Sequence, residues 1–185
     1  NMNLININKT EIVTALQPVL GVVERRNSLP ILLNVLINKK GDQLFFTTSD
    51  IELQMTSVLS LSKETTDGND SVFTVSAKKL FDILKSLSAD QKISFNLTQE
   101  KLTIKQNKSK FCIQTLPAKD FPIIELQKEE IINLKLEAKT FKELIDTVAF
   151  SMAIQDVRYY LNGLYLEVNP DGIVAVTTDG HRLSI

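Results

Sequence analysis

An amphipathic helix pattern that occurs three times in the chain is the feature that most limits its fold. In residues 9–16, 77–84 and 138–145, apolar side chains recur with the i, i+3, i+4, i+7 spacing of one helix face. The aligned stripes are Ile12, Ala15, Leu16 and Val19; Leu80, Ile83, Leu84 and Leu87; and Phe141, Leu144, Ile145 and Val148. Such self-similarity indicates a repeated structural unit.

Each predicted helix follows a short strand-like run and precedes a β-meander. The preceding runs are 4–7, 72–75 and 131–136. The meander strands are expected at 32–37, 43–48 and 52–61, then at 92–97, 101–106 and 110–115, and finally at 162–168 and 173–178. Polar, glycine-containing turns such as 38–42 and 169–172 separate them. The pattern predicts an α+β fold built from strand, helix and meander.

Local signals fix the ends of the first two helices. Asn8 is expected to cap the first helix, with Glu11 in the capping-box position, and Ser76 to cap the second. Pro18 falls late in the first helix, where a proline removes a backbone hydrogen bond. We therefore expect a bend or an early end there.

The first and third copies also agree in detail, because the pattern Thr48-Ser49-Asp50 returns about 129 residues later as Thr177-Thr178-Asp179. This displacement is nearly twice the helix spacing, so two units should form one domain (2–122) and the third should open a second (129–185). The proline-containing stretch 116–122 leads into a linker at 123–128. A unit with an apolar helix stripe needs a partner to cover it. We therefore expect the second domain to be truncated, with residues beyond 130 either poorly packed or paired with a second copy.

Composition limits the classes of function. The net charge is -1, from 21 basic and 22 acidic residues, whereas a protein that grips DNA over its whole surface should be basic. Any nucleic-acid binding must therefore use one segregated basic face. Cys112 is the only cysteine, which excludes an intrachain disulfide. No secretory signal or apolar run of ~20 residues is present, so a cytoplasmic location is expected.

Four motifs carry a family resemblance across the whole chain. They are SLPIL at 28–32, TLPAKDFP at 115–122, FSMAIQDVRYYLNG at 150–163 and TDGHRL at 178–183. Together they resemble the bacterial DNA sliding clamps, the β subunits of the replicative DNA polymerase. The resemblance implies the DNA clamp fold and a non-catalytic processivity factor without metal or cofactor. In that family two three-domain subunits close head-to-tail into a ring around duplex DNA. This chain would hold the first domain and half of the second.

The resemblance implies a DNA-facing surface in which the helices line the hole of the ring. Its residues would be Lys9, Lys78, Lys139 and Lys142 on the helices, Arg26 after the first helix, and Gln155, Tyr159 and Tyr160 in a loop. Weak phosphate contacts without sequence readout suit a protein that must slide. Two alternatives stay open: Glu11, Asp82, Glu143 and Asp146 could make these ordinary solvated faces, and the tyrosines could pack beneath their loop.

A second implied site is half of a hydrophobic cleft between domains two and three. It would receive a short linear peptide from the polymerase α subunit, the clamp loader and other partners that carry a clamp-binding motif. The matching residues are Leu161, Thr178, Gly180, His181, Arg182 and Leu183. Without the resemblance, Asp-Gly-His-Arg is more typical of a hairpin turn, and that alternative is kept.

A third implied site is the edge of domain one that meets the partner subunit in the homodimeric ring. Its residues would be Lys79, Lys101, Lys108, Lys110, Phe111 and Ile113. The alternative is a solvated edge strand whose lysines discourage unwanted pairing.

Two rival functions are weighed against the clamp. An enzyme would have to use Asp179-Gly180-His181, since Cys112 has no base near it in sequence and no Gly-rich phosphate loop or metal-ligand cluster is found. The other rival is a protein-recruitment module that does not encircle DNA. Release of the full-length parent from DNA that has been linearised would discriminate between the clamp and that module.

Overall fold

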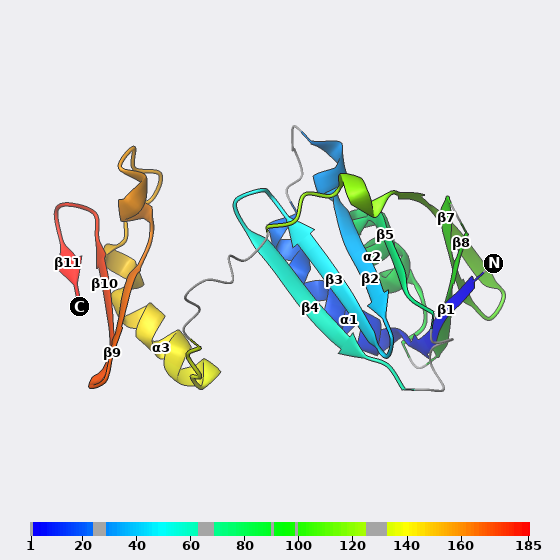
Figure 1. The fold of residues 1–185 in the computed structure, drawn as a ribbon, viewed down its shortest axis with the longest axis horizontal. Coiled ribbons are helices and arrows are strands. Elements are labelled where there is room, and N and C mark those ends of the chain that lie inside the picture. Colours follow the sequence, from blue (N-terminus) through cyan, green and yellow to red (C-terminus); the bar gives the residue numbers. More distant parts are fainter. Residues whose placement is uncertain (1, 24–28, 63–68, 90, 99, 125–132) are drawn as a thin grey trace. The chain divides into compact units, whose positions relative to one another are not determined.

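The computed structural model describes residues 2–23, 29–62, 69–89, 91–98, 100–124 and 133–185. The chain divides into two compact units, Asn1–Leu126 and Gln127–Ile185 (Figure 1). Among the described residues, no helix is long and apolar enough to span a membrane.

The first unit contains the first two copies of the repeat. Copy one consists of β1 (Met2–Asn8), α1 (Lys9–Leu16), β2 (Asn34–Lys40), β3 (Gln43–Ser49) and β4 (Gln54–Ser60). Copy two consists of β5 (Ser71–Ser76), α2 (Ala77–Ser86), β6 (Lys92–Leu97), β7 (Lys101–Gln106) and β8 (Ser109–Leu116). Short 3-10 helices cover Gln17–Val22, Pro30–Leu33 and Ala118–Asp120. The predicted order of strand, helix and meander is confirmed for both copies.

The two copies exchange their first strands. The eight-stranded sheet has the order β1-β6-β7-β8-β5-β2-β3-β4. Strand β1 of copy one pairs with β6 of copy two, with Ile5 opposite Phe95, whereas β5 of copy two pairs with β2 of copy one, with Ile37 opposite Phe73. All these pairings are antiparallel. Each meander is therefore extended by the first strand of the other copy.

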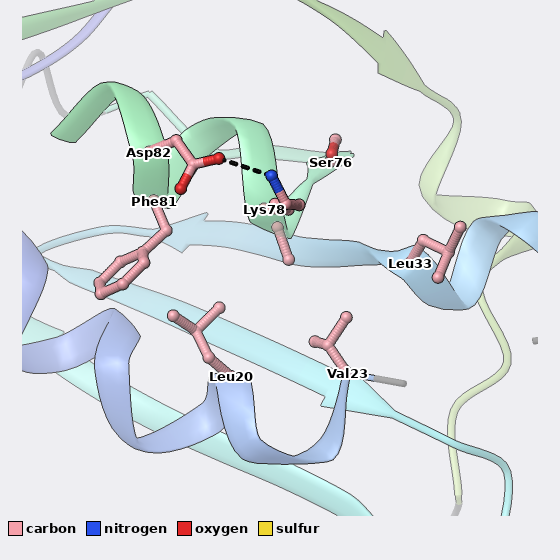
Figure 2. Close-up of a pocket in the computed structure, with 8 residues that line it drawn as sticks. Leu20, Val23, Leu33, Ser76, Lys78, Phe81 and Asp82 are labelled. Atoms are coloured by element: carbon pink, nitrogen blue, oxygen red, sulfur yellow. Dashed lines mark hydrogen bonds and ion pairs between the residues drawn. The ribbon is translucent and has the colours of Figure 1, made fainter. Parts of the chain in front are cut away.

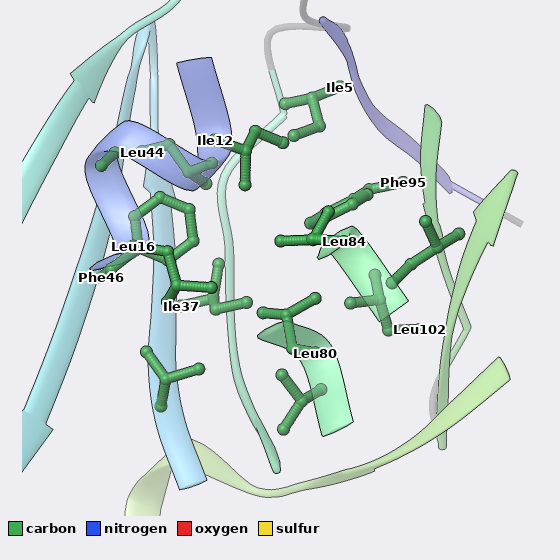
Figure 3. Close-up of a cluster of buried hydrophobic side chains, with 14 of the residues drawn as sticks. Ile5, Ile12, Leu16, Ile37, Leu44, Phe46, Leu80, Leu84, Phe95 and Leu102 are labelled. Carbon is green, nitrogen blue, oxygen red and sulfur yellow. The ribbon is translucent and has the colours of Figure 1, made fainter. Parts of the chain in front are cut away.

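Both helices pack over the same core, which lies between them and the sheet (Figure 3). Ile12, Leu16, Leu80 and Leu84 are all 0% exposed, so the predicted stripes of α1 and α2 face inward as expected. They pack in one cluster with the sheet residues, among them Phe46. Removing such a side chain to Ala typically costs about 2–5 kcal/mol, so this layer supplies much of the stability of the unit.

The helix-end predictions have mixed outcomes. The hydroxyl of Ser76 accepts the Lys79 N–H at 3.3 Å, which confirms the cap of α2. The α-helix ends at Leu16 and continues as the 3-10 helix that contains Pro18, so the early end is confirmed. The predicted side-chain cap by Asn8 is wrong, because Asn8 makes no such hydrogen bond. Asn8 is the last residue of β1, and the N–H of Lys9, the first helical residue, donates to the Gln91 carbonyl at 3.4 Å.

The first hairpin turn is shorter than predicted. Strand β2 continues to Lys40, and only Gly41 and Asp42 form the turn, with Gly41 at φ 56. The side chain of Lys39 is 0% exposed and donates to the Asn69 carbonyl. A polar sequence thus stays in the strand because tertiary contacts satisfy it, which local turn signals do not reveal.

The second unit holds the third copy. It comprises α3 (Ala138–Val148), β9 (Tyr165–Asn169), β10 (Gly172–Thr178) and β11 (Leu183–Ser184), with the sheet order β11-β10-β9. Short 3-10 helices cover Ala149–Ser151 and Tyr159–Asn162, so the strand predicted from residue 162 begins only at residue 165. The strand predicted at 131–136 lies partly outside the described residues, and positions 133–136 form no strand. The predicted helix is confirmed.

Candidate functional site

The predicted pocket residues lie on a tight turn after β10. The Thr178 hydroxyl accepts the Gly180 N–H at 3.0 Å and donates to the Arg182 carbonyl at 2.6 Å. The Asp179 carboxylate accepts the N–H groups of His181 and Arg182 at 2.9 and 3.0 Å. These two backbone N–H groups, assisted by the Arg182 side chain, lower the pKa of Asp179 to about 2. The turn interpretation is therefore correct for the local geometry, and the peptide site stays a prediction.

The same turn occurs in copy one. The Asp50 carboxylate accepts the N–H groups of Glu52 and Leu53 at 3.0 and 2.6 Å, and Ile51 has φ 84 where Gly180 has φ 88. The Ile51 N–H donates to the Ser49 hydroxyl at 3.1 Å, as that of Gly180 does to Thr178. The repeat extends one step further, because the hydroxyls of Thr48 and Thr177 donate to the carbonyls of Val19 and Val148. Corresponding hydrogen bonds in the two copies thus confirm the displacement of about 129 residues that the sequence predicted.

The loop predicted to face DNA presents two tyrosines to solvent. Tyr159 is 83% and Tyr160 67% exposed, and their rings meet edge to face with centroids 5.9 Å apart. The alternative that they pack beneath the loop is wrong for the unit described here. Gln155, also exposed, has φ 57. The tyrosines present π-faces of the kind on which unpaired bases stack.

Three polar residues that sequence analysis did not single out hold this loop. Arg158 donates to the Asp156 carboxylate through its backbone N–H at 2.8 Å, Nε at 3.0 Å and Nη2 at 2.8 Å. The side chain of Asn162 accepts the Asp156 N–H and donates to the Asp156 carbonyl, both at 2.9 Å. The Arg158 side chain is the largest cause of the lowered pKa of Asp156, about 2. In the sequence, the Asp-x-Arg spacing is the feature that could have indicated the contact between Asp156 and Arg158.

The remaining pocket residues are arranged around this turn and loop. Leu161 is half-buried and accepts the Ala153 N–H through its carbonyl at 3.1 Å, whereas Leu183 is 60% exposed. The guanidinium of Arg182 lies over the exposed Phe150 ring, 5.8 Å from its centroid. The second unit thus places apolar and cationic groups near one another on a solvent-facing surface.

The lysines of α2 and α3 that were predicted to face DNA project into solvent, and each forms an ion pair with a carboxylate four residues later. The pairs are Lys78–Asp82 at 3.0 Å, Lys139–Glu143 at 3.9 Å and Lys142–Asp146. Exposed pairs of this kind are worth roughly 0.2–1 kcal/mol, so a phosphate can compete for the lysine. The acidic residues dilute the charge of these faces, as the sequence predicted.

Lys9 differs from the other predicted lysines. Its ammonium group donates to the carbonyls of Leu87 and Lys85 at the end of α2, the latter at 3.4 Å. Those carbonyls lack partners within the helix, and a cation there also complements the helix dipole. Lys9 therefore joins the two helices and is less free than the prediction of a mobile phosphate contact assumed. Arg26, the other predicted contact in this unit, lies outside the described residues.

A cleft of about 640 Å3 separates the 3-10 helix after α1 from the start of α2 (Figure 2). Leu20 lines it from the 3-10 helix, Val23 from the position directly after that helix and Phe81 from α2, together with the Lys78–Asp82 pair. Its lining is mainly apolar, and the two charged residues in it, Lys78 and Asp82, pair with each other.

The predicted subunit contact combines an exposed basic edge with a buried apolar layer. Lys79, Lys101, Lys108 and Lys110 are exposed. Strand β8 pairs with β7 at residues 109–114 and with β5 at Thr115 and Leu116, so residues 109–114 have no other described strand beside them. Phe111 and Ile113 face the core, Ile113 being 4% exposed, because alternate residues of a strand point to opposite faces. The expected apolar centre is thus largely part of the core of this unit.

Solved structures define the class to which this fold belongs. The DNA polymerase III subunit beta from Pseudomonas aeruginosa matches with a TM-score of 0.89 and 42% identity, over 96% of this chain and 47% of that one. The DNA polymerase sliding clamp from Caulobacter crescentus matches with a TM-score of 0.86 and 32% identity, over 99% of this chain and 50% of that one. The architecture is the DNA clamp fold.

Family models give the more specific result. The N-terminal domain of the DNA polymerase III beta subunit matches residues 2–125, and its central domain matches residues 135–185. The chain therefore belongs to the DNA polymerase III beta subunit family. Relatives named beta sliding clamp, from Pseudomonas putida and Escherichia coli, are 42% and 36% identical over 179 residues. The chain spans about half of their length (48%).

Proposed function

We propose that this chain is part of a processivity factor, a non-catalytic sliding clamp that encircles duplex DNA in the bacterial cytoplasm and tethers the replicative polymerase. Residues 2–122 would form the first clamp domain, 123–128 the linker, and 129–185 the first half of the second domain. Family membership, together with coverage of about half of the relatives, supports this assignment.

One observation carries the proposal: two helices lie over one core on a continuous sheet and direct exposed lysines to solvent. Lys78 and Lys79 lie in the first turn of α2, and Lys85 lies in its last. A layer with few cations, of which Lys78 is paired with Asp82, gives weak phosphate contacts and no base readout, which suits sliding. Arg26, Lys9, Lys139, Lys142, Gln155, Tyr159 and Tyr160 complete the proposed DNA-facing set.

The second unit would provide half of a peptide-binding cleft. Leu161 and Leu183 offer apolar area, Arg182 a charge, and the turn at Gly180 a backbone that a peptide can approach closely. The proposed occupants are linear motifs of the polymerase α subunit, the clamp loader and other clamp-binding proteins. The lysine-bearing edge around β8 would meet an acidic edge of the second subunit and close a homodimeric ring.

Encirclement is tested with the full-length parent loaded by its clamp loader onto nicked circular DNA. We expect retention on the circle and release within the dead time after a restriction enzyme linearises it, because topology rather than contact holds the ring. A recruitment module that does not encircle DNA would instead dissociate at the same rate from circular and linear DNA, and that result would contradict the proposal. Blocking both ends of the linear DNA should restore retention.

A further inference from the structure

The two copies of the tight turn differ at one informative position. Ile51 and Gly180 have almost the same φ, 84 and 88, and the same hydrogen bonds surround them. This φ is unfavourable for a β-branched residue, yet copy one accommodates isoleucine there. Backbone conformation alone therefore does not explain why the second unit has glycine.

The surroundings of Gly180 supply the explanation. A Cβ atom at this position would lie 3.1 Å from Nη1 and 3.2 Å from Nη2 of Arg158, tighter than nine in ten real Cβ contacts, so the guanidinium would have to shift. The missing side chain leaves the space in which the guanidinium packs against the turn. Nη2 also lies 3.4 Å from the Asp179 carbonyl, to which it donates. Glycine at position 180 thus leaves room for the Arg158 guanidinium.

Arg158 also stabilises the loop that carries Tyr159 and Tyr160. Its Nε and Nη2 hold the Asp156 carboxylate, and its carbonyl accepts the Leu161 N–H at 2.9 Å. Tyr159 and Tyr160 lie in the chain between Arg158 and Leu161, which this last hydrogen bond joins. A planar guanidinium with several fixed donors is suited to holding two segments in one relative orientation.

We propose that Arg158 is a positioning residue that couples the 179–182 turn to the Tyr159–Tyr160 segment. A ligand that displaces the turn then also changes the orientation of the two tyrosines, and the reverse holds because coupling between sites is reciprocal. The identity of the ligands, a peptide at the turn and nucleic-acid bases at the tyrosines, rests on the proposed function. The mechanical link itself does not.

The chain is well suited to a direct test, because its three tyrosines are Tyr159, Tyr160 and Tyr165. Incorporation of 3-fluorotyrosine into the whole chain gives three fluorine NMR signals. Tyr165 serves as the internal reference, since it lies on β9 with its hydroxyl 3.5 Å from Glu167. The variants are Gly180→Ala, Arg158→Gln and the combination of both, with Ile51→Ala as the matched control in copy one.

We expect Gly180→Ala to shift the signals of Tyr159 and Tyr160 while that of Tyr165 stays in place. In the Arg158→Gln background the same substitution should cause no further shift, because the coupled group is already gone. Arg158→Lys should restore the signals only in part, since an ammonium lacks the two-donor geometry. Ile51→Ala should leave all three unchanged.

The proposal is overturned if Gly180→Ala leaves both tyrosine signals unmoved, or moves them equally with and without Arg158. If Gly180→Ala does not fold, Arg158→Gln alone decides, because it must shift Tyr159 and Tyr160 and spare Tyr165. These measurements use no DNA and no peptide. A failure here therefore leaves encirclement untouched, and a failure of encirclement leaves the link between turn and loop untouched.

Discussion

The apolar stripes of α2 and α3 have the same sequence pattern but very different surroundings. Leu80 in α2 is 0% exposed, whereas Phe141 at the same position of α3 is 39% exposed. Copy two receives β1 from copy one and packs its helix over a shared core, while the sheet of the second unit has only three strands. The comparison teaches that periodicity decides where a helix forms, and the partner layer decides how much its burial stabilises the fold.

The largest expected effect comes from truncating the stripe at equivalent positions. Leu80→Ala should lower the free energy of unfolding of the first unit by about 2–5 kcal/mol, because it leaves a cavity in a sealed core. Phe141→Ala should cost the second unit less than half as much, although it removes a larger side chain. Hydrogen exchange, resolved amide by amide, measures each unit separately. Equal losses in both units would break the comparison.

A smaller effect separates the two helix caps of the first unit. Ser76→Ala should destabilise the protein by about 1 kcal/mol, because it removes the acceptor of the Lys79 N–H. Asn8→Ala should change stability by only a few tenths of a kcal/mol, since its side chain makes no cap hydrogen bond. Urea denaturation of both variants checks this difference. A cost for Asn8→Ala as large as that for Ser76→Ala would contradict the assigned caps.

The buried threonines test whether the repeated hydrogen bond is equivalent in the two units. Thr48→Val and Thr177→Val remove matching hydroxyls that donate to the carbonyls of Val19 and Val148. Each should cost about 0.5–1.5 kcal/mol, the usual net value of one such bond. Local stabilities from hydrogen exchange should fall by similar amounts, because both sites are almost fully buried. A cost confined to one unit would show that the bond is equivalent only in geometry.

The smallest expected effect is on pH dependence and is confined to the second unit. Asp156 and Asp179 have pKa values of about 2, below the ordinary value of 3.8, because donors stabilise their charged forms. Their stabilising contribution is therefore complete above pH 3.8 and is lost as the pH falls toward 2. Carboxyl carbon NMR titration measures both midpoints. Arg158→Gln should raise the midpoint of Asp156 more than that of Asp179, because the Arg158 side chain is hydrogen-bonded to the Asp156 carboxylate; an unchanged midpoint of Asp156 would contradict the assigned cause.

Local patterns predicted the regular elements well. All three helices lie where the i, i+3, i+4 spacing put them, and Pro18 ends α1 as expected. The exchange of β1 and β5 between the two copies could not be predicted from the sequence, because antiparallel pairing between distant strands leaves no local signal. The Asn8 prediction failed in a different way, because Asn8 does occupy the N-cap position but its side chain makes no cap hydrogen bond.

The candidate sites show the same limit. Sequence reasoning found the turn at 178–183 and the exposed tyrosines, because their residue types are distinctive. It missed that Lys9 caps α2 across 78 residues, and that Arg158 fills the space left by Gly180. Both depend on side chains that meet only after folding.

The salt dependence of residence on closed circular DNA tests the central claim, a ring held by topology with weak lysine contacts, most directly. We expect the dwell time of the full-length parent to be nearly constant between about 50 and 200 mM salt, while its diffusion along the DNA changes. A contact-bound protein would instead lose several orders of magnitude in affinity over that range. A dwell time that falls steeply with salt on an unbroken circle would contradict encirclement.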